Sequence, residues 1–462
     1  MATHALDDAK LSRFHLKTTL YGNGGHLCDG YILGAIVPAL PLFAQSHPVS
    51  SLMSGLIGAS ALIGVFLGSV LFGWVTDRIG RRRMFVIDLA LFVVLSLAQI
   101  AVTGAVMLLV LRVLLGIAVG ADYTIATTLV AEFAPRKYRA TLLAVGPAMW
   151  TIGYVLAIVV GTAIAEFGGD GAWRWILATS AVPALILLIL RRNTPESPRW
   201  LARNGRADEG LAILRKHVSP AATLADLADE EEEDESTGSL REVFAEQHRK
   251  RLAFACLFWF CQVVPYFAVF TFLPTILESL DIESGFWQTT SVNLFLLIGG
   301  AVGIVTIGKI GRRPYTLVSF ALLTASTLAI GLWQSAPAGY VIALFALFAL
   351  ISSAMAALDT VYPSELFPTS VRASATGICV SFSRIGAAIG TLLLPMGIDH
   401  FGAHGVTLMT GVVAGLGLLI SIAWAPETAG LPLAQAAGDT KEGPGKSPTG
   451  NPDRSSSFVS QQ

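Results

Sequence analysis

Ionisable side chains lie within several long apolar stretches of the sequence: Asp29, Arg112, Asp122 and Arg384, with Asp359 as a weaker fifth case. A charged group near the centre of a bilayer costs roughly 2.5–3.5 kcal/mol, so each one needs an opposite charge or a wet cavity. A carboxylate in such a place can bind and release a proton as an opposite charge approaches or leaves. The planar guanidinium group of arginine suits a carboxylate or a phosphate. These residues therefore indicate proton binding and anion binding.

Asp29 lies near the middle of the first apolar stretch, with Asn23 and His26 on a nearby helical face. Arg112, in the fourth stretch, is the obvious partner for its carboxylate. Two interpretations are open. The pair either couples proton binding to another event, which we favour, or is a purely structural ion pair.

Arg384 lies in the middle of the eleventh stretch and Asp122 in the fourth. Arg384 could bind an anionic ligand or neutralise a buried acid such as Asp359. Asp122 follows Arg112 by about 15 Å of helix, and it could bind ligand, relay a proton or pair with Arg384. Neighbouring side chains could add stacking and hydrogen bonds: Tyr123, Gln262 and Tyr266 are the main ligand-binding candidates, beside Trp150, Trp259 and Asn293.

The composition indicates which elements position these residues. Of 462 residues, 53% are hydrophobic and 14% are charged, whereas soluble domains carry roughly a quarter charged residues. Windows of about 20 mostly apolar residues, enough to cross a bilayer, recur throughout. A large soluble core would need amphipathic helices, but these segments are apolar all round. The four cysteines have no metal-type spacing, and free thiols are expected.

We predict an all-α membrane protein with twelve transmembrane helices in two pseudo-symmetric six-helix bundles. The spans are expected at 20–44, 51–74, 84–103, 105–133, 140–166, 173–191, 252–278, 287–308, 315–334, 339–362, 373–397 and 404–425. The predicted domains are an N-terminal segment (1–19), a first bundle (20–191), a linker with an acidic run and short amphipathic helices (192–250), a second bundle (251–426) and a disordered tail (427–462).

The short loops predict the orientation, because loops on the cytoplasmic side carry an excess of Lys and Arg. Basic residues gather between spans 2 and 3, 4 and 5, and 8 and 9, whereas loops such as 45–50 and 399–404 have none. Arg174 is the exception. Both termini, the linker and the tail are therefore expected in the cytoplasm.

Three motifs recur in nearly one register. Gly-Arg-Arg at 80–82 recurs at 311–313, and Pro-Glu-Ser at 195–197 recurs as Pro-Glu-Thr at 426–428. Glu132, Pro135 and Arg139 recur as Glu365, Pro368 and Arg372. With six spans in each half, the repeats are parallel and point to a pseudo-two-fold axis along the membrane normal.

These motifs resemble those of the major facilitator superfamily. The segment 73–82 (GWVTDRIGRR) matches the family's loop between spans 2 and 3. Arg112, Glu132 and Arg139, with the segments 195–201 (PESPRWL) and 363–368 (PSELFP), resemble the sugar-porter-like group. Gln262 stands where sugar porters carry a Gln-Gln pair, and Gly-Ala-Asp-Tyr at 120–123 is similar to an element of phosphate:proton symporters. The resemblance is best to sugar-porter-like metabolite:proton symporters.

The loop motifs are expected to form carboxylate–guanidinium sets at the cytoplasmic helix ends. We interpret them as a conformational latch that holds the two halves together when the carrier faces outward. Its predicted members are Asp77, Arg78, Gly80, Arg81, Arg82, Glu132, Arg139, Glu365 and Arg372.

The sequence thus predicts a secondary active transporter in the cell membrane, moving a sugar, sugar acid or organic anion by proton symport and alternating access. In the symporters that it resembles, the pair matching Asp29 and Arg112 couples protons to sugar. Proton-antiport export and a non-transporting receptor are the alternatives. The sequence contains no catalytic set, phosphate-binding glycine loop, metal cluster or cofactor motif. Expected partners are the solute, protons and the lipid bilayer, without nucleic acid, and the chain is expected to be a monomer.

Overall fold

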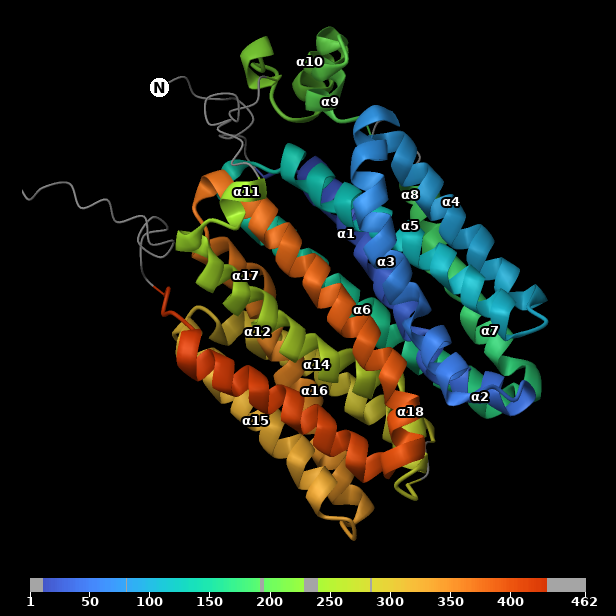
Figure 1. The fold of residues 1–462 in the computed structure, drawn as a ribbon. Helices are drawn as coiled ribbons and strands as arrows, with labels where there is room; N and C mark the ends of the chain where they lie inside the picture. The colour runs from blue at the N-terminus through green and yellow to red at the C-terminus, as the bar shows by residue number, and fades with distance from the viewer. Residues whose placement is uncertain (1–10, 80, 192–194, 228–239, 283–284, 430–462) are drawn as a thin grey trace, which may run out of the picture.

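The computed structural model describes residues 11–79, 81–191, 195–227, 240–282 and 285–429. All regular secondary structure within these ranges is helical. Two bundles of long helices lie side by side, and α3 (Ser51–Ile79) of the first runs along α18 (Thr369–Trp424) of the second (Figure 1).

The first bundle holds the six spans expected before the linker. Besides α3, its helices are α1 (Arg13–Gly34), α2 (Ile36–Ser46), α4 (Arg81–Ala98), α5 (Ala105–Phe133), α6 (Arg136–Phe167), α7 (Ala172–Ala178) and α8 (Ala181–Arg191), with 3-10 turns at Gln99–Ala101 and Gly169–Gly171. Spans 1 and 6 are each built from two successive helices, α1 with α2 and α7 with α8.

The second bundle follows the linker. Besides α18, its helices are α12 (Glu246–Thr271), α13 (Leu273–Glu278), α14 (Phe286–Thr306), α15 (Arg312–Leu332), α16 (Ala338–Met355) and α17 (Ala357–Leu366). The linker contributes α9 (Pro198–Arg203), α10 (Ala207–His217), a 3-10 turn (Leu224–Leu227) and α11 (Leu240–Val243). The acidic run predicted at 229–235 lies outside the described residues.

Within the described ranges, eleven helical segments are long and apolar enough to cross a membrane. The last one, α18, has 56 residues, which corresponds to about 84 Å and is more than twice a bilayer core. It bends at Gly402, whose φ is 69° and ψ is 174°, so α18 contains both spans 11 and 12. The prediction of twelve spans is confirmed.

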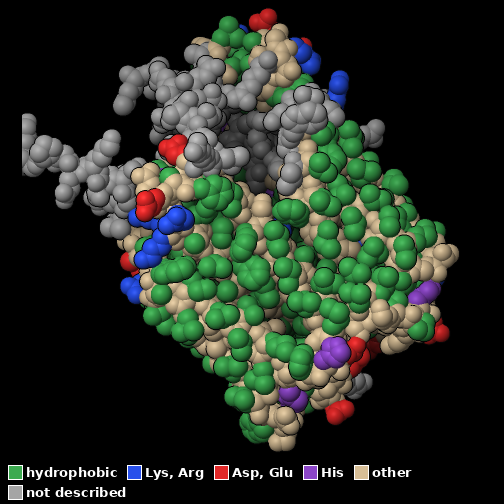
Figure 2. All heavy atoms as spheres, in the orientation of Figure 1, with side chains coloured by type: hydrophobic (Ala, Val, Ile, Leu, Met, Phe, Trp, Pro, Cys, Tyr) green, Lys and Arg blue, Asp and Glu red, His purple; other side chains and the backbone are tan. Residues whose placement is uncertain are grey.

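The outer surface is suited to lipid. Hydrophobic side chains cover the middle of the face shown in Figure 2, and charged side chains gather towards its ends. Large apolar side chains such as Val94, Leu332 and Leu419 are more than half exposed. Such exposure is costly in water but favourable against acyl chains, which are as apolar as leucine.

Glycines let the helices of one bundle approach closely. A Cβ added at Gly116 of α5 would lie 2.1 Å from the carbonyl oxygen of Ala61 in α3, and one at Gly68 of α3 would lie 2.1 Å from that of Ile117 in α5. Glycines four residues apart, at 64 and 68 and at 116 and 120, predict from the sequence alone that helices approach closely. In the structure the two pairs face each other's helix. This prediction is confirmed.

Substituting Gly116 with alanine should therefore push α3 and α5 apart. Overpacking of this kind costs about 1–3 kcal/mol, so Gly116→Ala should lower the melting temperature of the purified protein by several degrees. Gly339→Ala is the matched control, because a Cβ there meets nothing within 4 Å. An equal melting temperature for Gly116→Ala and the control would contradict the close-packing account.

Candidate functional site

Arg384 of α18 lies at the junction of the two bundles. Its guanidinium carbon is 5.3 Å from the centroid of the Tyr123 ring, which belongs to α5 of the first bundle. Two carboxylates act on it electrostatically, Asp29 from the first bundle and Asp359 from the second. A cation between two acids and an aromatic face, contributed by both halves, is the centre of the candidate site.

The second bundle supplies polar side chains around this arginine. Asp359 of α17 lies beside Gln262 and Trp259 of α12. Tyr266, one helical turn after Gln262, is buried with its phenol near Tyr123 and Asp359. The structure therefore brings together four ligand-binding candidates that the sequence singled out, Tyr123, Gln262, Tyr266 and Arg384.

Aromatic rings from both bundles extend this junction towards α6. The indole ring of Trp150 stacks on Tyr154 at 5.3 Å within the first bundle. It also meets the edge of Phe267 in the second bundle at 6.2 Å. Apolar ring faces together with a few polar groups that fix orientation are typical of sites that hold a small polar molecule.

Asp29 of α1 is fully buried. Among the described residues, neither of its carboxylate oxygens has a hydrogen-bond partner. The charged groups that act on it most strongly are two further acids, Asp122 and Asp88, followed by Arg191 and Arg384. A buried carboxyl on which both acids and cations act is suited to gaining and losing a proton.

Arg112 does not form the direct ion pair with Asp29 that the sequence suggested. Its Nη1 donates a hydrogen bond of 2.8 Å to the carbonyl oxygen of Ile32, one turn beyond Asp29 on α1. The side chain is 1% exposed, and its Nε and Nη2 have no hydrogen-bond partner in the described part of the chain. In this conformation Arg112 holds the backbone of α1, and its role in proton coupling stays a prediction.

Asp122 lies among helices of the first bundle. Its Oδ1 is 3.6 Å from Nη1 of Arg191, at the end of α8. Arg191 also donates hydrogen bonds to the carbonyl oxygens of Tyr21 and Gly22, and its guanidinium lies 4.1 Å from the centroid of the Phe85 ring. Asp122 thus pairs with Arg191 and not with Arg384, the partner that the sequence suggested.

Asp88 and Arg191 are site residues that the sequence analysis missed. Asp88 is a single acid inside the apolar stretch 84–103, which is the same signal that marked Asp29. Arg191 stands at the edge of the sixth stretch, where a basic residue is expected to face water. Its burial at 3% exposure has no signal in the local sequence.

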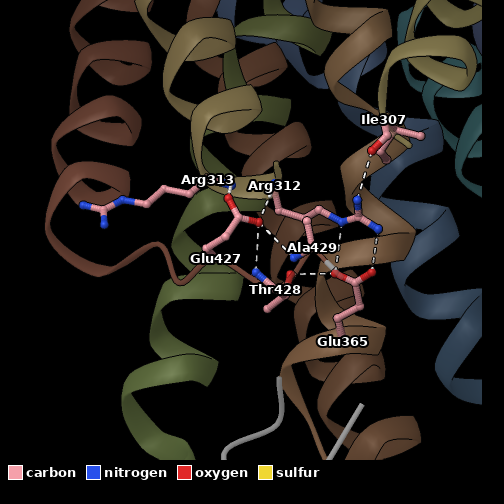
Figure 3. A network of polar contacts seen from close by, with 7 residues as sticks. All are labelled: Ile307, Arg312, Arg313, Glu365, Glu427, Thr428 and Ala429. Atoms are coloured by element: carbon pink, nitrogen blue, oxygen red, sulfur yellow. Dashed lines mark hydrogen bonds and ion pairs between the residues drawn. The ribbon is translucent and has the colours of Figure 1, made fainter. Parts of the chain in front are cut away.

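Charged residues at one end of the second bundle form a network (Figure 3). The guanidinium of Arg312 in α15 binds Glu365 of α17 through two hydrogen bonds of 2.8 and 3.2 Å. The hydroxyl of Thr428, after α18, donates to the same carboxylate at 2.6 Å. Arg372 instead donates to the carbonyl oxygen of Phe367 at 3.2 Å.

This network links α15, α17 and the chain after α18, and the hydrogen bonds that Glu365 and Arg372 make with described residues lie within the second half. The remaining predicted latch members lie outside the described part of the structure. Gly80 is not described at all, and the side chains are not described for Asp77, Arg78, Arg81, Arg82, Glu132 and Arg139. The latch between the halves stays a prediction.

The end of the bundles away from α9 and α10 brings the halves into contact. The hydroxyl of Ser51 in α3 donates a hydrogen bond to the carboxylate of Asp399 in α18. A Cβ added at Gly55 of α3 would lie 2.2 Å from the carbonyl oxygen of Leu392 in α18. Short α2 also packs against short α13. At this end, backbone lies against backbone across the junction.

Glu427 anchors the chain after α18 to the start of α15. Partial burial raises the pKa of its carboxyl, but hydrogen bonds from the backbone N–H groups of Ala429, Arg312, Arg313 and Thr428 outweigh burial and hold the pKa below its usual value. The four N–H groups lie 2.8–3.2 Å from the carboxylate oxygens. Residues 427–429, which the sequence assigned to the tail, are therefore held against the second bundle.

A depressed carboxyl pKa makes the ionised group a source of stability above the unfolded pKa, and this contribution is lost as the pH falls through the folded pKa. Glu427→Gln should therefore lower the melting temperature at neutral pH, and the difference from the parent protein should shrink on acidification. Melting curves between neutral and acidic pH test this. Glu166→Gln, exposed near the end of α6, controls for the loss of one carboxylate, and a pH-independent difference would contradict the account.

Comparison with known proteins places the chain among transporters. The family model described as "Sugar (and other) transporter" matches residues 9–439. The inner membrane metabolite transport protein YgcS of Escherichia coli is 37% identical over 431 residues, which are 93% of this chain and 96% of that protein. The arabinose–proton symporter of Bacillus subtilis is 27% identical over 87% of this chain and 90% of its own length.

A solved structure shares the fold. The inward-open conformation of the xylose transporter XylE from E. coli matches with a TM-score of 0.80 over 92% of this chain and 99% of that chain, at 23% sequence identity.

Proposed function

Because this chain belongs to the sugar transporter family of the major facilitator superfamily, we propose that it carries a small polar metabolite together with protons across the cell membrane. The membrane setting is supported by YgcS, whose name places that relative in the inner membrane. One observation carries the proposal, the position of Arg384 between Tyr123 of one bundle and Asp359 of the other.

The substrate that fits this site is a sugar acid, an organic anion or a sugar. The guanidinium group of Arg384 suits a carboxylate through paired hydrogen bonds. Gln262 has a buried amide oxygen without a hydrogen-bond partner among the described residues, so it can accept a bond from a substrate hydroxyl group. Trp259, 8% exposed beside it, can pack against an apolar ring face.

Asp29 is the proposed proton carrier. Its carboxyl is buried with no hydrogen-bond partner in the described residues, while Arg384 acts on it from the other bundle. A cation that approaches favours the carboxylate, and one that leaves favours the acid. A substrate that binds Arg384 would change the effect of this cation on Asp29, and so the preference of Asp29 for its carboxylate or its acid form. Solute binding and proton binding would thereby be coupled. The name of the arabinose–proton symporter supports proton coupling in this family.

The proposed cycle is alternating access, in which the two bundles rock about the central site. The structure is packed at the end away from the linker, through Ser51 with Asp399 and Gly55 with Leu392. If the linker end is cytoplasmic, as the loop charges predict, this conformation is closed to the outside. We propose that orientation for both termini.

The substrate class is tested by a thermal-shift screen of the purified protein against sugars, inositols, aromatic acids and sugar acids. A solute that raises the melting temperature and accumulates in proteoliposomes under an inward proton gradient would support proton symport. Failure of every stabilising solute to accumulate under that gradient would count against it.

Replacing Asp29 with asparagine should uncouple the proton from the solute. Asp29→Asn keeps the side-chain shape without a titratable proton, so accumulation driven by a pH gradient should be lost while solute exchange at equal pH persists. Both are measured as isotope uptake into proteoliposomes. Asp170→Asn, at an exposed turn, is the matched control, and full accumulation by Asp29→Asn would exclude this carboxyl as the carrier.

Removing the guanidinium group of Arg384 should weaken the binding of anionic solutes selectively. Hydrogen bonds to charged groups contribute about 1.5–3 kcal/mol, so Arg384→Ala should bind an anionic solute roughly tenfold to a hundredfold more weakly. Arg384→Lys should recover part of the affinity through its charge. Titration calorimetry with an anionic and a neutral solute, with Arg206→Ala in the linker as control, makes the comparison. Equal losses for both solutes would assign Arg384 to structure.

A further inference from the structure

A second pair of carboxyls lies inside the first bundle. Asp88 of α4 is 1% exposed and Asp122 of α5 is 0% exposed. Their carboxyl groups are within hydrogen-bonding reach of each other, and Asp122 has the largest effect of any charged group on Asp88. Neither residue belongs to the group around Gln262 and Tyr266 of the second bundle.

The hydrogen bonds around this pair do not balance two negative charges. Oδ1 of Asp88 accepts one hydrogen bond of 2.7 Å, from the backbone N–H of Leu89. Its Oδ2 is buried and has no hydrogen-bond partner among the described residues. A buried carboxylate oxygen without a donor is costly, whereas a carboxylic acid that donates its own proton to a neighbouring carboxylate removes that cost.

One guanidinium group is the counter-charge for both carboxyls. Arg191 lies 3.6 Å from Asp122 and also acts on Asp88. Two of its hydrogen bonds go to the carbonyl oxygens of Tyr21 and Gly22. One positive charge neutralises one of two negative charges, and two carboxyls that share a site do not both ionise readily.

Other titratable groups also surround this pair. On α1, His26, Cys28 and Asp29 face the pair electrostatically. His26 is 5% exposed, and its Nδ1 has no hydrogen-bond partner in the described structure. Arg384 acts on this region through Asp29 and lies beside Tyr123. Asp29 adds a further negative charge when ionised, which favours a proton on the pair.

Helix α1 lies directly against the pair. A Cβ added at Gly25 would be 1.8 Å from Oδ2 of Asp122, so the backbone of α1 packs onto this carboxyl without an intervening side chain. The same helix carries Asp29 one turn further along. A movement of α1 during transport would therefore change the surroundings of both proton positions together.

We propose that Asp88 and Asp122 form a second proton-binding site, in which the two carboxyls share one proton and Arg191 neutralises the remaining negative charge. Binding the proton forms one O–H bond on a carboxylate and breaks one O–H bond of the hydronium ion that delivers it, which leaves as water. The role of this site in the transport cycle rests on the proposed proton coupling, but its occupancy does not, because a bound proton can be measured without any transported solute.

The experiment is infrared difference spectroscopy of the full-length protein in lipid nanodiscs, titrated from neutral to alkaline pH. Carboxylic acid groups are identified by their C=O stretching band and by its shift when aspartate is labelled with ¹³C. The parent protein should show a labelled acid band at neutral pH that Asp88→Asn removes. Asp29→Asn and the exposed control Asp170→Asn should keep this band.

Persistence of every acid band in folded Asp88→Asn would overturn the proposal. If Asp88→Asn does not fold, Asp88→Glu provides the second test, because the acid band should move or lose its sensitivity to the aspartate label; an unchanged band would again overturn it. The outcome is separate from that of proton symport, since normal accumulation by Asp29→Asn would refute the carrier role of Asp29 and leave the band at Asp88 unaffected.

Discussion

The free energy of placing charge in an apolar interior governs the arrangement of this protein. Arg384 lies where two helical bundles meet, and its counter-charges come from both of them, Asp29 on one side and Asp359 on the other. Because the two acids belong to different bundles, neither bundle alone supplies both counter-charges. Movement of one bundle against the other therefore changes the electrostatic energy of the centre, and a bound anion can change it in return.

Charges at the end of the second bundle have a different role. Arg312, Glu365 and Glu427 join α15, α17 and the chain after α18 through direct hydrogen bonds. In the first bundle, glycines bring α3 and α5 into backbone contact. Both arrangements make a bundle stiff within itself. Stiff bundles with a charged centre between them suit a motion in which each half moves as one body.

Much of this architecture could be predicted from the sequence, because a bilayer requires long apolar helices and the loop motifs repeat in register. The glycine spacing predicted close helix packing, and the structure places that packing between α3 and α5. The partners of the buried charges were harder to predict. Arg112 was expected to bind Asp29 but reaches the carbonyl oxygen of Ile32, and Arg191 at a span end proved to be buried. Helical spacing shows which face of a helix a residue occupies. It does not show which helices lie against that face, so the partner of a long side chain cannot be predicted from the spacing.

The bend at Gly402 joins the last two spans with almost no connecting chain. Its φ of 69° is in the left-handed region that glycine adopts without strain, so the junction turns within one residue. A turn this tight has little room for inserted sequence. Epitope tags or fused domains would be better placed at the exposed segment 333–337 between α15 and α16, where extra residues need not separate the two packed spans.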